Sequence, residues 1–277
     1  MSRAEVVVVV LNWNGWRDTL ACLASLKQLD YLDARVLVVD NGSTDGSIEH
    51  IRQAMPDVEL LQTGANLGFG GGCNAGIRQA LRQRADYVWL VNSDATVAPG
   101  ALSALVTLAQ RNSALGAVGS VVHELDEPEK IQLWGGGRVN LWTGRSRHLL
   151  TEQTPHFISG ASALLRCAAL REVDLFDEQK FFMYWEDTDL GFRLRQAGWQ
   201  LAVAPDSRIL HKQSASLGRN SPQLDHYFIQ SGVRFFKRHA PFPLLPISFM
   251  LARMLLKRLA TGQLTRVRAV LKGFLSA

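Results

Sequence analysis

The chain has 277 residues, a net charge of +5 and 47% hydrophobic residues, enough for the packed core of one large α/β domain or two small ones. Its three cysteines are scattered and odd in number, which excludes a complete disulfide framework and a cysteine-based metal site. A reducing compartment, the cytoplasm, therefore fits best.

The first part of the chain alternates short apolar runs with helical patterns. Strands are expected at residues 6–11, 36–39, 58–62 and 87–91, and helices at residues 17–29, 47–55, 74–84 and 99–111. The first apolar run is too short to span a bilayer and has no cleavage site, so we interpret it as a buried strand and expect no signal peptide. The alternation predicts right-handed βαβ units, a parallel sheet, and ligands at the carboxyl ends of its strands.

The pattern changes after residue 116. Further strands are expected at residues 118–123, 157–166 and 200–205, hairpin elements near residues 134 and 142, and a short helix at residues 168–173. Residues 207–211 are expected to lead into a polar loop, and residues 217–223, rich in Ser, Asn and Gly, to be flexible. From residue 224 the pattern is helical, with breaks at Pro241, Pro243 and Pro246.

An acidic stretch, residues 182–190, organises the chain. It reads Phe-Met-Tyr-Trp-Glu-Asp-Thr-Asp-Leu and places Glu186, Asp187 and Asp189 just before a helical pattern that stops at Gly198. Free N–H groups and the helix dipole favour ionised acids at such a position, and an ionised carboxylate beside a cleft can act as a general base. The alternative is that Glu186 and Asp187 only cap the helix and that Asp189 is solvated.

Polar residues follow several of the expected strands. Asp94, in Asn92-Ser93-Asp94, suits Mg²⁺ or Mn²⁺, which take oxygen ligands, although it could instead cap the next helix. Asp40 and Asn41 could bind a nucleobase or a ribose, or could form an ordinary βα turn. His211 follows a later strand and could complete a metal site, although a lone histidine is more often structural.

A glycine-rich segment, residues 66–74, precedes a helix. Its glycines let the backbone approach a ligand, and the N–H groups at the start of a helix attract phosphate. The segment is neither a Walker loop nor a dinucleotide fingerprint. The alternative is a flexible loop over residues 64–72.

Five motifs in this order resemble those of family-2 inverting glycosyltransferases with a GT-A fold, and among them bacterial rhamnosyltransferases of cell-surface polysaccharide synthesis. The motifs are Asn12-Trp13-Asn14-Gly15, Asp40-Asn41-Gly42-Ser43-Thr44-Asp45-Gly46, Asn66-Leu67-Gly68-Phe69, Asn92-Ser93-Asp94 and Trp185-Glu186-Asp187-Thr188-Asp189. The resemblance covers roughly residues 6 to 211. It implies an α/β chain with a Rossmann-like, mostly parallel central sheet flanked by helices, and a C-terminal helical extension.

The resemblance also implies roles for residues. The catalytic pair is Asp187, the expected base, and Glu186, and the metal ligands are Asp94 and His211. The expected donor-binding residues are Asn12, Asn14, Asp40, Asn41, Asn66, Gly68, Phe69, Asn74, Asn92 and Asp94. The expected acceptor-binding residues are Trp134, Trp142, Tyr184 and Trp185. The family's metal motif often has two carboxylates, and because Asn92 replaces the first here, Asp94 carries most of the charge.

The implied reaction is an inverting sugar transfer assisted by Mg²⁺ or Mn²⁺. L-Rhamnose from dTDP-rhamnose is the favoured donor, and a UDP-sugar is the alternative. The acceptor is a saccharide or a lipid-linked saccharide in cell-wall, O-antigen or exopolysaccharide synthesis. We expect a catalytic domain over residues 1–223, with a nucleotide-sugar half over about 1–115 and an acceptor half over about 116–223. Two alternatives stay open, a nucleotidyltransferase and a non-catalytic protein that binds a nucleotide-sugar or a membrane.

The last segment, residues 224–277, is basic and amphipathic. Apolar and basic residues interleave over residues 244–259 and 265–275, which suits helices that lie in a membrane interface, while prolines and charges argue against a spanning helix. The alternative is that these apolar stripes pack on the domain or on a second subunit in a homodimer. We expect no nucleic-acid partner and a peripheral location at the inner face of the cell membrane.

Overall fold

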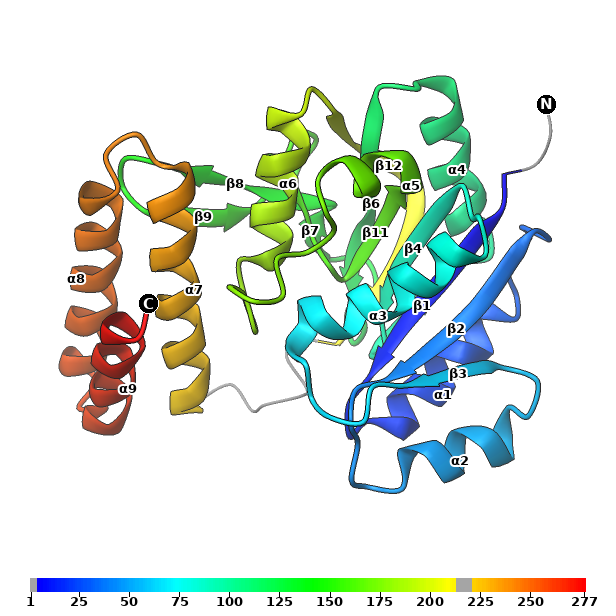
Figure 1. Cartoon of the computed structure of the whole chain (residues 1–277), viewed down its shortest axis with the longest axis horizontal. Helices are drawn as coiled ribbons and strands as arrows, with labels where there is room; N and C mark the ends of the chain where they lie inside the picture. Colours follow the sequence, from blue (N-terminus) through cyan, green and yellow to red (C-terminus); the bar gives the residue numbers. More distant parts are fainter. Residues whose placement is uncertain (1–3, 213–220) are drawn as a thin grey trace.

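A computed structural model describes residues 4–212 and 221–277, and Figure 1 shows the arrangement of its elements. The main sheet of the described part contains β1 (Val6–Asn12), β2 (Ala34–Asp40), β3 (Glu59–Gln62), β4 (Tyr87–Asn92), β5 (Ala95–Val97), β6 (Leu115–Glu124), β7 (Ile131–Trp134), β11 (Ser162–Arg166) and β12 (Gln200–His211). Their order is β3-β2-β1-β4-β11-β6-β12-β5, with β7 paired to β6. β1–β4, β6 and β12 run in one direction, and the other three run against them. The predicted α/β fold with a mostly parallel central sheet is therefore confirmed.

A run of valines explains why β1 lies in the middle of this sheet. Successive side chains of a strand point to opposite faces, so Val6, Val8 and Val10 enter one core while Val7 and Val9 enter the other. The first core also contains side chains of α1 (Trp16–Leu26), α2 (Ser47–Ala54) and α4 (Ala101–Arg111). The second contains side chains of α3 (Gly68–Arg82), α5 (Cys167–Glu172) and α6 (Glu186–Gln196). A strand that is buried on both faces reads as a continuous apolar run, as here.

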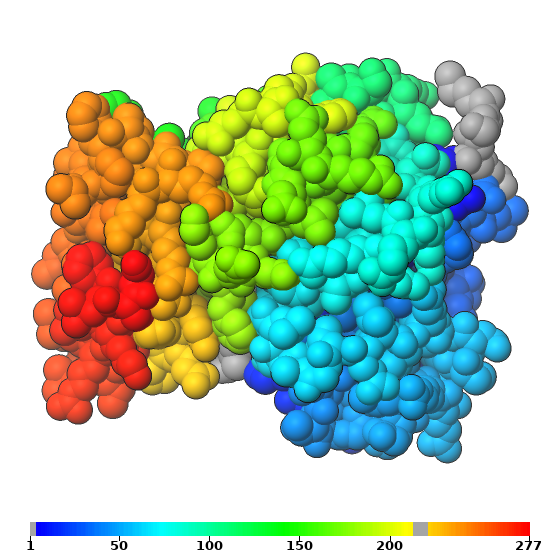
Figure 2. Space-filling view, viewed as in Figure 1, coloured from blue at the N-terminus to red at the C-terminus, as the bar shows by residue number. Residues whose placement is uncertain are grey.

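A third core joins α6 and a small second sheet to the C-terminal helices. These helices are α7 (Pro222–His239), α8 (Leu244–Ala260) and α9 (Leu264–Leu275), and a small sheet of β8 (Gly136–Asn140), β9 (Arg145–His148) and β10 (Phe157–Ile158) lies beside them. The third core is largely aromatic and includes Phe181, Trp185, Phe192, Phe235 and Phe236. Figure 2 shows the helices as a block at one end of the molecule, in orange and red.

One buried carboxylate ties the three C-terminal helices together. Asp225 in α7 accepts two hydrogen bonds from Arg258 in α8 and two from Arg266 in α9. Burial would raise the pKa of Asp225, but the hydrogen bonds and charges of the two arginines lower it below its ordinary value. Within residues 4–212 and 221–277, no helix is both long and apolar enough to cross a bilayer.

The glycine-rich segment is more ordered than predicted. Helix α3 begins at Gly68, so the expected loop is wrong for residues 68–72. A Cβ on Gly72 would lie 2.5 Å from a methyl carbon of Leu11, and one on Gly76 would lie 2.6 Å from Val9. These glycines therefore let α3 approach the sheet closely, which is a packing role that single-sequence periodicity does not reveal.

Other differences lie at strand ends and prolines. β12 continues to His211, beyond the strand expected at residues 200–205, because after a register shift near Arg208 it pairs with the unpredicted strand β5. The expected flexible segment, residues 217–223, lies outside the described residues except for Ser221, the N-cap of α7, and Pro222 and Gln223, which begin that helix. Pro246 lies in the first turn of α8, where the missing N–H costs no helical bond, so the predicted break there is wrong.

Candidate active site

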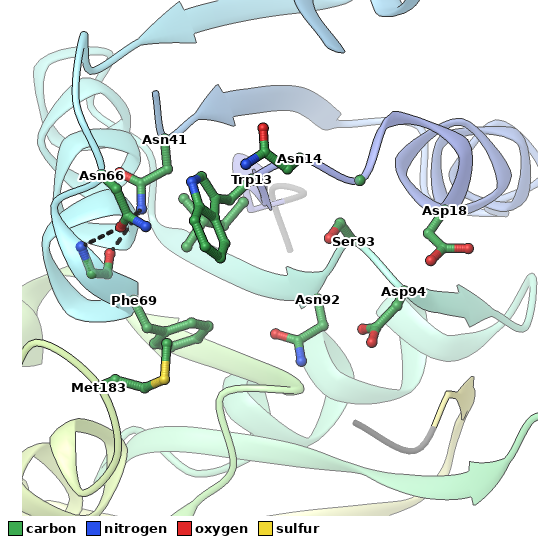
Figure 3. Close-up of a pocket in the computed structure, with 13 residues that line it drawn as sticks. Trp13, Asn14, Asp18, Asn41, Asn66, Phe69, Asn92, Ser93, Asp94 and Met183 are labelled. Atoms are coloured by element: carbon green, nitrogen blue, oxygen red, sulfur yellow. Dashed lines mark hydrogen bonds between the residues drawn. The ribbon is translucent and has the colours of Figure 1, made fainter. Parts of the chain in front are cut away.

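A cavity of about 250 Å³ lies at the carboxyl ends of β1, β2 and β4 (Figure 3). Its lining residues are Leu11, Trp13, Asn14, Gly15, Asp18, Asn41, Asn66, Gly68, Phe69, Asn92, Ser93, Asp94 and Met183. Seven of the ten expected donor-binding residues are among them, from Asn14 to Asp94. Figure 3 shows Asn41 and Asn66 at one end of the cavity and Asp94 and Asp18 at the other.

Two asparagine amides build the first end of the cavity. The Asn41 side chain donates to Asn66 Oδ1 at 3.1 Å and to the Gly68 carbonyl at 3.0 Å, while its own Oδ1 accepts from the Leu67 N–H at 3.1 Å. Asn66 Oδ1 also accepts from the Gly68 N–H at 2.9 Å. Gly68 has φ +75°, and a Cβ there would lie 2.1 Å from the Phe182 carbonyl oxygen, so only glycine fits. The amides thus fix the start of α3 against the acidic stretch.

Three of the expected donor-binding residues, Asn12, Asp40 and Asn74, are buried and do not line the cavity. Asn12 donates to Asp40 Oδ1 at 2.8 Å, and Asp40 Oδ2 accepts from the Ser43 N–H at 3.0 Å. Asn74 bonds both backbone groups of Phe176, at 2.9 and 3.1 Å. Each of the three predicted side chains is at most 1% exposed. Their observed partners are therefore protein groups, and the expected contact with a donor stays a prediction.

A carboxylate and a histidine meet at the second end of the cavity. The pairing of β12 with β5 brings His211 beside Asp94, with 3.1 Å between His211 Nε2 and Asp94 Oδ1. His211 Nε2 also lies 3.2 Å from the Asn92 side-chain nitrogen, and its Nδ1 lies 2.8 Å from Gln132 Oε1. Because that amide oxygen can only accept, Nδ1 carries the proton, and in a neutral ring Nε2 presents a lone pair toward Asp94.

This corner fits a hard divalent cation. A metal-binding histidine commonly donates its second ring N–H to a neighbouring oxygen, as His211 does to Gln132. In residues 4–212 and 221–277 no three His, Cys, Asp or Glu side chains form a metal cluster, so Asp94 and His211 would be two ligands of an incomplete set. Mg²⁺ and Mn²⁺ sites that use few protein ligands keep waters and phosphate oxygens in the other positions. Asp18, at the same end, pairs with Lys212.

The acidic stretch begins helix α6, as predicted, but its carboxylates differ in surroundings. Glu186 is 7% exposed, and its buried Oε2 has no hydrogen-bond partner among the described residues. Burial, together with the nearby charge of Asp187, raises the pKa of Glu186 to about 8. Asp187 is partly exposed, and its carboxylate accepts from the N–H groups of Gly160 and Thr188 at 3.3 and 2.6 Å. Burial raises the pKa of Asp187 although these bonds act against it.

Asp187 lies beside the cavity and does not line it. Gly160 separates the two, because its N–H bonds the Asp187 carboxylate while a Cβ on it would lie 2.6 Å from the ring of Phe69, a lining residue. His148 of β9 also acts on Asp187 through its charge, in the direction that lowers the pKa. The carboxylate therefore lies between the cavity wall and the β8–β9 hairpin.

Asp189 is fully buried, so the alternative that it is solvated is wrong. It accepts hydrogen bonds from Arg193 at 2.7 Å and from Arg238 and His239 of α7 at 2.8 Å each. Burial would raise the pKa of Asp189, but these donors outweigh it and lower the pKa. The residue therefore fastens the C-terminal helices to α6.

Asp189→Asn is expected to destabilise the fold by roughly 3–5 kcal/mol, because the fully buried carboxylate that pairs with Arg193 and Arg238 would be lost and Arg193 would keep its partly buried position without this counter-charge. Urea unfolding measures this loss. The pKa of Asp189 is lowered in the folded state, so its contribution to the free energy of unfolding is fully present above the ordinary aspartate pKa. This contribution shrinks as the pH falls through the folded-state pKa. Glu5→Gln, which breaks the exposed pair with Arg35, is the control and should cost under about 1 kcal/mol. Equal losses in both variants would contradict the assigned role.

Comparison with known proteins decides the family. The model of "Glycosyl transferase family 2" matches residues 6–174. The chain belongs to glycosyltransferase family 2. This glycosyltransferase is 35% identical over 224 residues to the N-acetylglucosaminyl-diphospho-decaprenol L-rhamnosyltransferase of Mycobacterium tuberculosis, a match that covers 72% of the chain and 73% of the relative. Family membership decides against the nucleotidyltransferase and non-catalytic alternatives.

Solved structures agree on the fold of the glycosyltransferase. The crystal structure of GalNAc-T7 with UDP, GalNAc and Mn²⁺ has a TM-score of 0.72 at 15% identity, covering 97% of this chain and 55% of that one. The mannosyltransferase PcManGT of Pyrobaculum calidifontis, in complex with GDP-Man and Mn²⁺, has a TM-score of 0.63 at 20% identity, covering 100% and 77%. These likenesses confirm the predicted GT-A fold.

The four aromatic residues expected to bind the acceptor do not form one platform in the glycosyltransferase. Trp185 is 4% exposed and packs against Phe235 and Phe236 in the third core, and its expected contact with an acceptor stays a prediction. Trp142 is 52% exposed at the end of the β8–β9 hairpin. Trp134 and Tyr184 are half-buried. None of the four lines the cavity.

Seven residues of the site were not predicted as site residues from the sequence of the glycosyltransferase: Leu11, Trp13, Gly15, Asp18, Ser93 and Met183 of the lining, and Gln132 beside His211. Trp13 and Met183 line the cavity within motifs that were already recognised, so their positions could have been inferred. Asp18 lies in the first turn of α1, four residues after Asn14, so its nearness to a recognised motif could have suggested it. Gln132 had no signal, because only the pairing of β7 with β6 brings it to His211.

Proposed function

We propose that this glycosyltransferase transfers a sugar with inversion from a nucleoside-diphosphate donor, with dTDP-rhamnose favoured, to a lipid-linked saccharide. The observation that carries the proposal is the cavity at the strand ends, with amides at one end and the Asp94–His211 pair at the other. The named activity of the 35%-identical relative supports rhamnose as the sugar and a diphospho-lipid as the acceptor carrier.

We assign the two ends of the cavity to the two parts of the donor. Asn14 and Asn66 offer amide groups to a base and a ribose, Asn41 holds Asn66 in place, and the Trp13 ring offers a face for stacking. Asp94 and His211 would hold Mg²⁺ or Mn²⁺ beside the diphosphate. When bound, the metal would neutralise the charge that develops on the departing diphosphate.

Asp187 is assigned as the base. A hydroxyl oxygen of the acceptor forms the bond to the anomeric carbon, the bond from that carbon to the diphosphate oxygen breaks, and Asp187 accepts the hydroxyl proton. The N–H groups of Gly160 and Thr188 hold the carboxylate in place, and a pKa raised by burial makes it a stronger base. With a pKa of about 8, Glu186 holds a proton at neutral pH, so one of the two adjacent acids is ionised.

The halves of the catalytic domain follow from this assignment. Apart from Met183, every lining residue of the cavity comes from the first 94 residues, which supports residues 1–115 as the donor half. Asp187 lies between the cavity and β9, which supports residues 116–223 as the acceptor half. The acceptor would therefore approach from the side of the β8–β9 hairpin.

A donor screen tests the proposal. Thermal shifts with dTDP-rhamnose, dTDP, UDP-hexoses and GDP-hexoses, each with and without Mn²⁺, rank the ligands, because a ligand that binds only the native state raises the melting temperature. We expect the largest shift with dTDP-rhamnose and Mn²⁺. Efficient turnover of a UDP-hexose without turnover of dTDP-rhamnose would overturn the donor assignment.

Gln132→Leu is expected to weaken Mn²⁺ binding in the presence of dTDP by roughly 10–100-fold, the usual effect of removing a partner of a metal-binding histidine. The reason is that His211 loses the acceptor that keeps its proton on Nδ1 and its Nε2 lone pair toward Asp94. Gln132→Glu keeps an acceptor and should restore binding. Calorimetric Mn²⁺ titration measures both variants.

Gln153→Leu is the control, because it makes the same chemical change at an exposed residue outside the cavity. It should bind Mn²⁺ as the wild type does. If Gln132→Leu also kept wild-type affinity, the positioning role of Gln132 would be refuted.

A further inference from the structure

Helix α8 exposes an apolar stripe along its length. Leu245, Phe249, Leu256 and Leu259 are 41%, 52%, 67% and 53% exposed, and exposed Ala252 lies between them. Their spacing alternates between four and three residues, which places all five on one side of a helix. Soluble monomers rarely expose a continuous apolar surface of this length without a partner for it.

The opposite side of α8 is anchored to the protein. Ile247 and Met250 are 5% and 0% exposed, and a Cβ on Gly232 of α7 would lie 2.8 Å from the Met250 sulfur. Figure 1 shows α8 at the end of the molecule farthest from β1–β3. The stripe therefore faces outward from a fixed helix, and folding within the described residues leaves it uncovered.

Two aromatic rings extend the stripe onto the β8–β9 hairpin. Trp142, 52% exposed, packs against Phe242, 63% exposed, with 5.7 Å between ring centroids. Arg253 donates to the Gly144 carbonyl at 3.2 Å and so holds the hairpin turn on α8. We call the combined surface the α8 surface, and its members are Trp142, Phe242, Leu245, Phe249, Ala252, Leu256 and Leu259.

All charged side chains of α8 and α9 are basic. No Asp or Glu follows Asp225 in the sequence, and Asp225 itself is buried and matched by Arg258 and Arg266. Lys257 of α8 is exposed, as are Arg268 and Lys272 of the neighbouring helix α9. A second copy docked through α8 would thus bring like charges together without a carboxylate between them, whereas an anionic bilayer would supply the opposite charge.

We propose that the α8 surface binds the interface of an anionic lipid bilayer. Its apolar side chains enter the acyl boundary and the neighbouring lysines and arginine contact lipid phosphates, which is how amphipathic helices with basic edges bind membranes. Trp142 lies at the rim of the surface, where amphipathic rings favour the headgroup level. The proposal goes beyond the sugar transfer and needs no assumption about donor or acceptor.

Vesicle sedimentation of the full-length protein tests the proposal. The vesicles are pure phosphatidylcholine, or phosphatidylcholine with phosphatidylglycerol, and they contain no acceptor, so failure here does not bear on the transfer reaction. We expect binding to the anionic vesicles at low salt, and binding at least roughly tenfold weaker to neutral vesicles or at high salt. Wild-type protein that stays in the supernatant with anionic vesicles would overturn the proposal.

Two variants separate the α8 surface from general stickiness. F249S/L256S removes two apolar members of the surface and should lose at least roughly tenfold in vesicle binding. L32S changes Leu32, which is 76% exposed and lies outside the C-terminal helices. This variant should bind vesicles as the wild type does. Unchanged melting temperatures and dTDP binding verify that both variants fold. Equal binding by F249S/L256S and wild type would refute the proposal.

The competing occupant, a second copy of the chain, gives a different result. Analytical ultracentrifugation without lipid should show the same mass for wild type and F249S/L256S. A wild-type dimer that this double substitution converts to a monomer would instead assign the α8 surface to self-association and overturn the membrane proposal.

Discussion

Asp187→Asn is expected to lower the rate of sugar transfer by roughly 10²–10⁴-fold, the usual value of general base catalysis, while donor affinity stays close to that of the wild type. The amide is nearly isosteric and can keep the hydrogen bonds from Gly160 and Thr188 through its oxygen, but it cannot accept the acceptor's proton. Because Asp187 does not line the donor cavity, the affinity for dTDP should be the same in the variant and the wild type. Transfer kinetics and calorimetry together measure the two effects.

Asp206→Asn is the matched control, since Asp206 is an exposed aspartate on β12 outside the cavity. It should leave both rate and affinity unchanged. Near-normal turnover in Asp187→Asn would remove Asp187 from the role of base and leave Glu186 as the next carboxylate to test.

Asp94→Asn is expected to remove the dependence of donor binding on Mn²⁺. The substitution keeps the shape of the β4–β5 connection but removes the carboxylate that faces His211 Nε2. The metal would lose a charged ligand and bind at least roughly tenfold more weakly. Calorimetric titration of dTDP with and without Mn²⁺ measures how strongly donor binding depends on the metal. In the wild type Mn²⁺ should tighten dTDP binding, and in the variant it should not.

Asp18→Asn distinguishes a specific ligand from a general loss of negative charge in the same cavity. Asp18 pairs with Lys212, so it should contribute less to metal binding than Asp94 does. If Mn²⁺ tightened dTDP binding in Asp94→Asn as much as it does in the wild type, Asp94 would not be a metal ligand.

Local patterns were sufficient to predict the donor half of the fold. The valine run of β1 and the Leu-rich spacing of α1 are signals of burial that need no knowledge of distant residues. Once the strands are parallel, residues after each strand must meet at one edge, which is why Asn14, Asn41, Asn92 and Asp94 were predicted to lie together. The His211–Asp94 contact followed from the family resemblance rather than from any local pattern.

Contacts between distant segments could not be predicted in the same way. The alternative that Asp189 is solvated stayed open because its partners Arg238 and His239 lie about 50 residues later in the chain. The burial of Trp185, an expected acceptor-binding residue, was not foreseen because the phenylalanines that cover it belong to α7. Gln132 reaches His211 through a strand pairing that has no sequence signature. In each case tertiary packing, which a single sequence does not encode locally, decides the role.

The most direct test of the proposed reaction is the anomeric configuration of its product. The full-length enzyme is incubated with dTDP-rhamnose, Mn²⁺ and a short-chain lipid diphosphate that carries N-acetylglucosamine, and the product is examined by NMR through its one-bond C1–H1 coupling. A direct displacement with Asp187 as base predicts a rhamnoside whose anomeric configuration is opposite to that of the donor. A product with the configuration of the donor would contradict the single-displacement mechanism and the role given to Asp187.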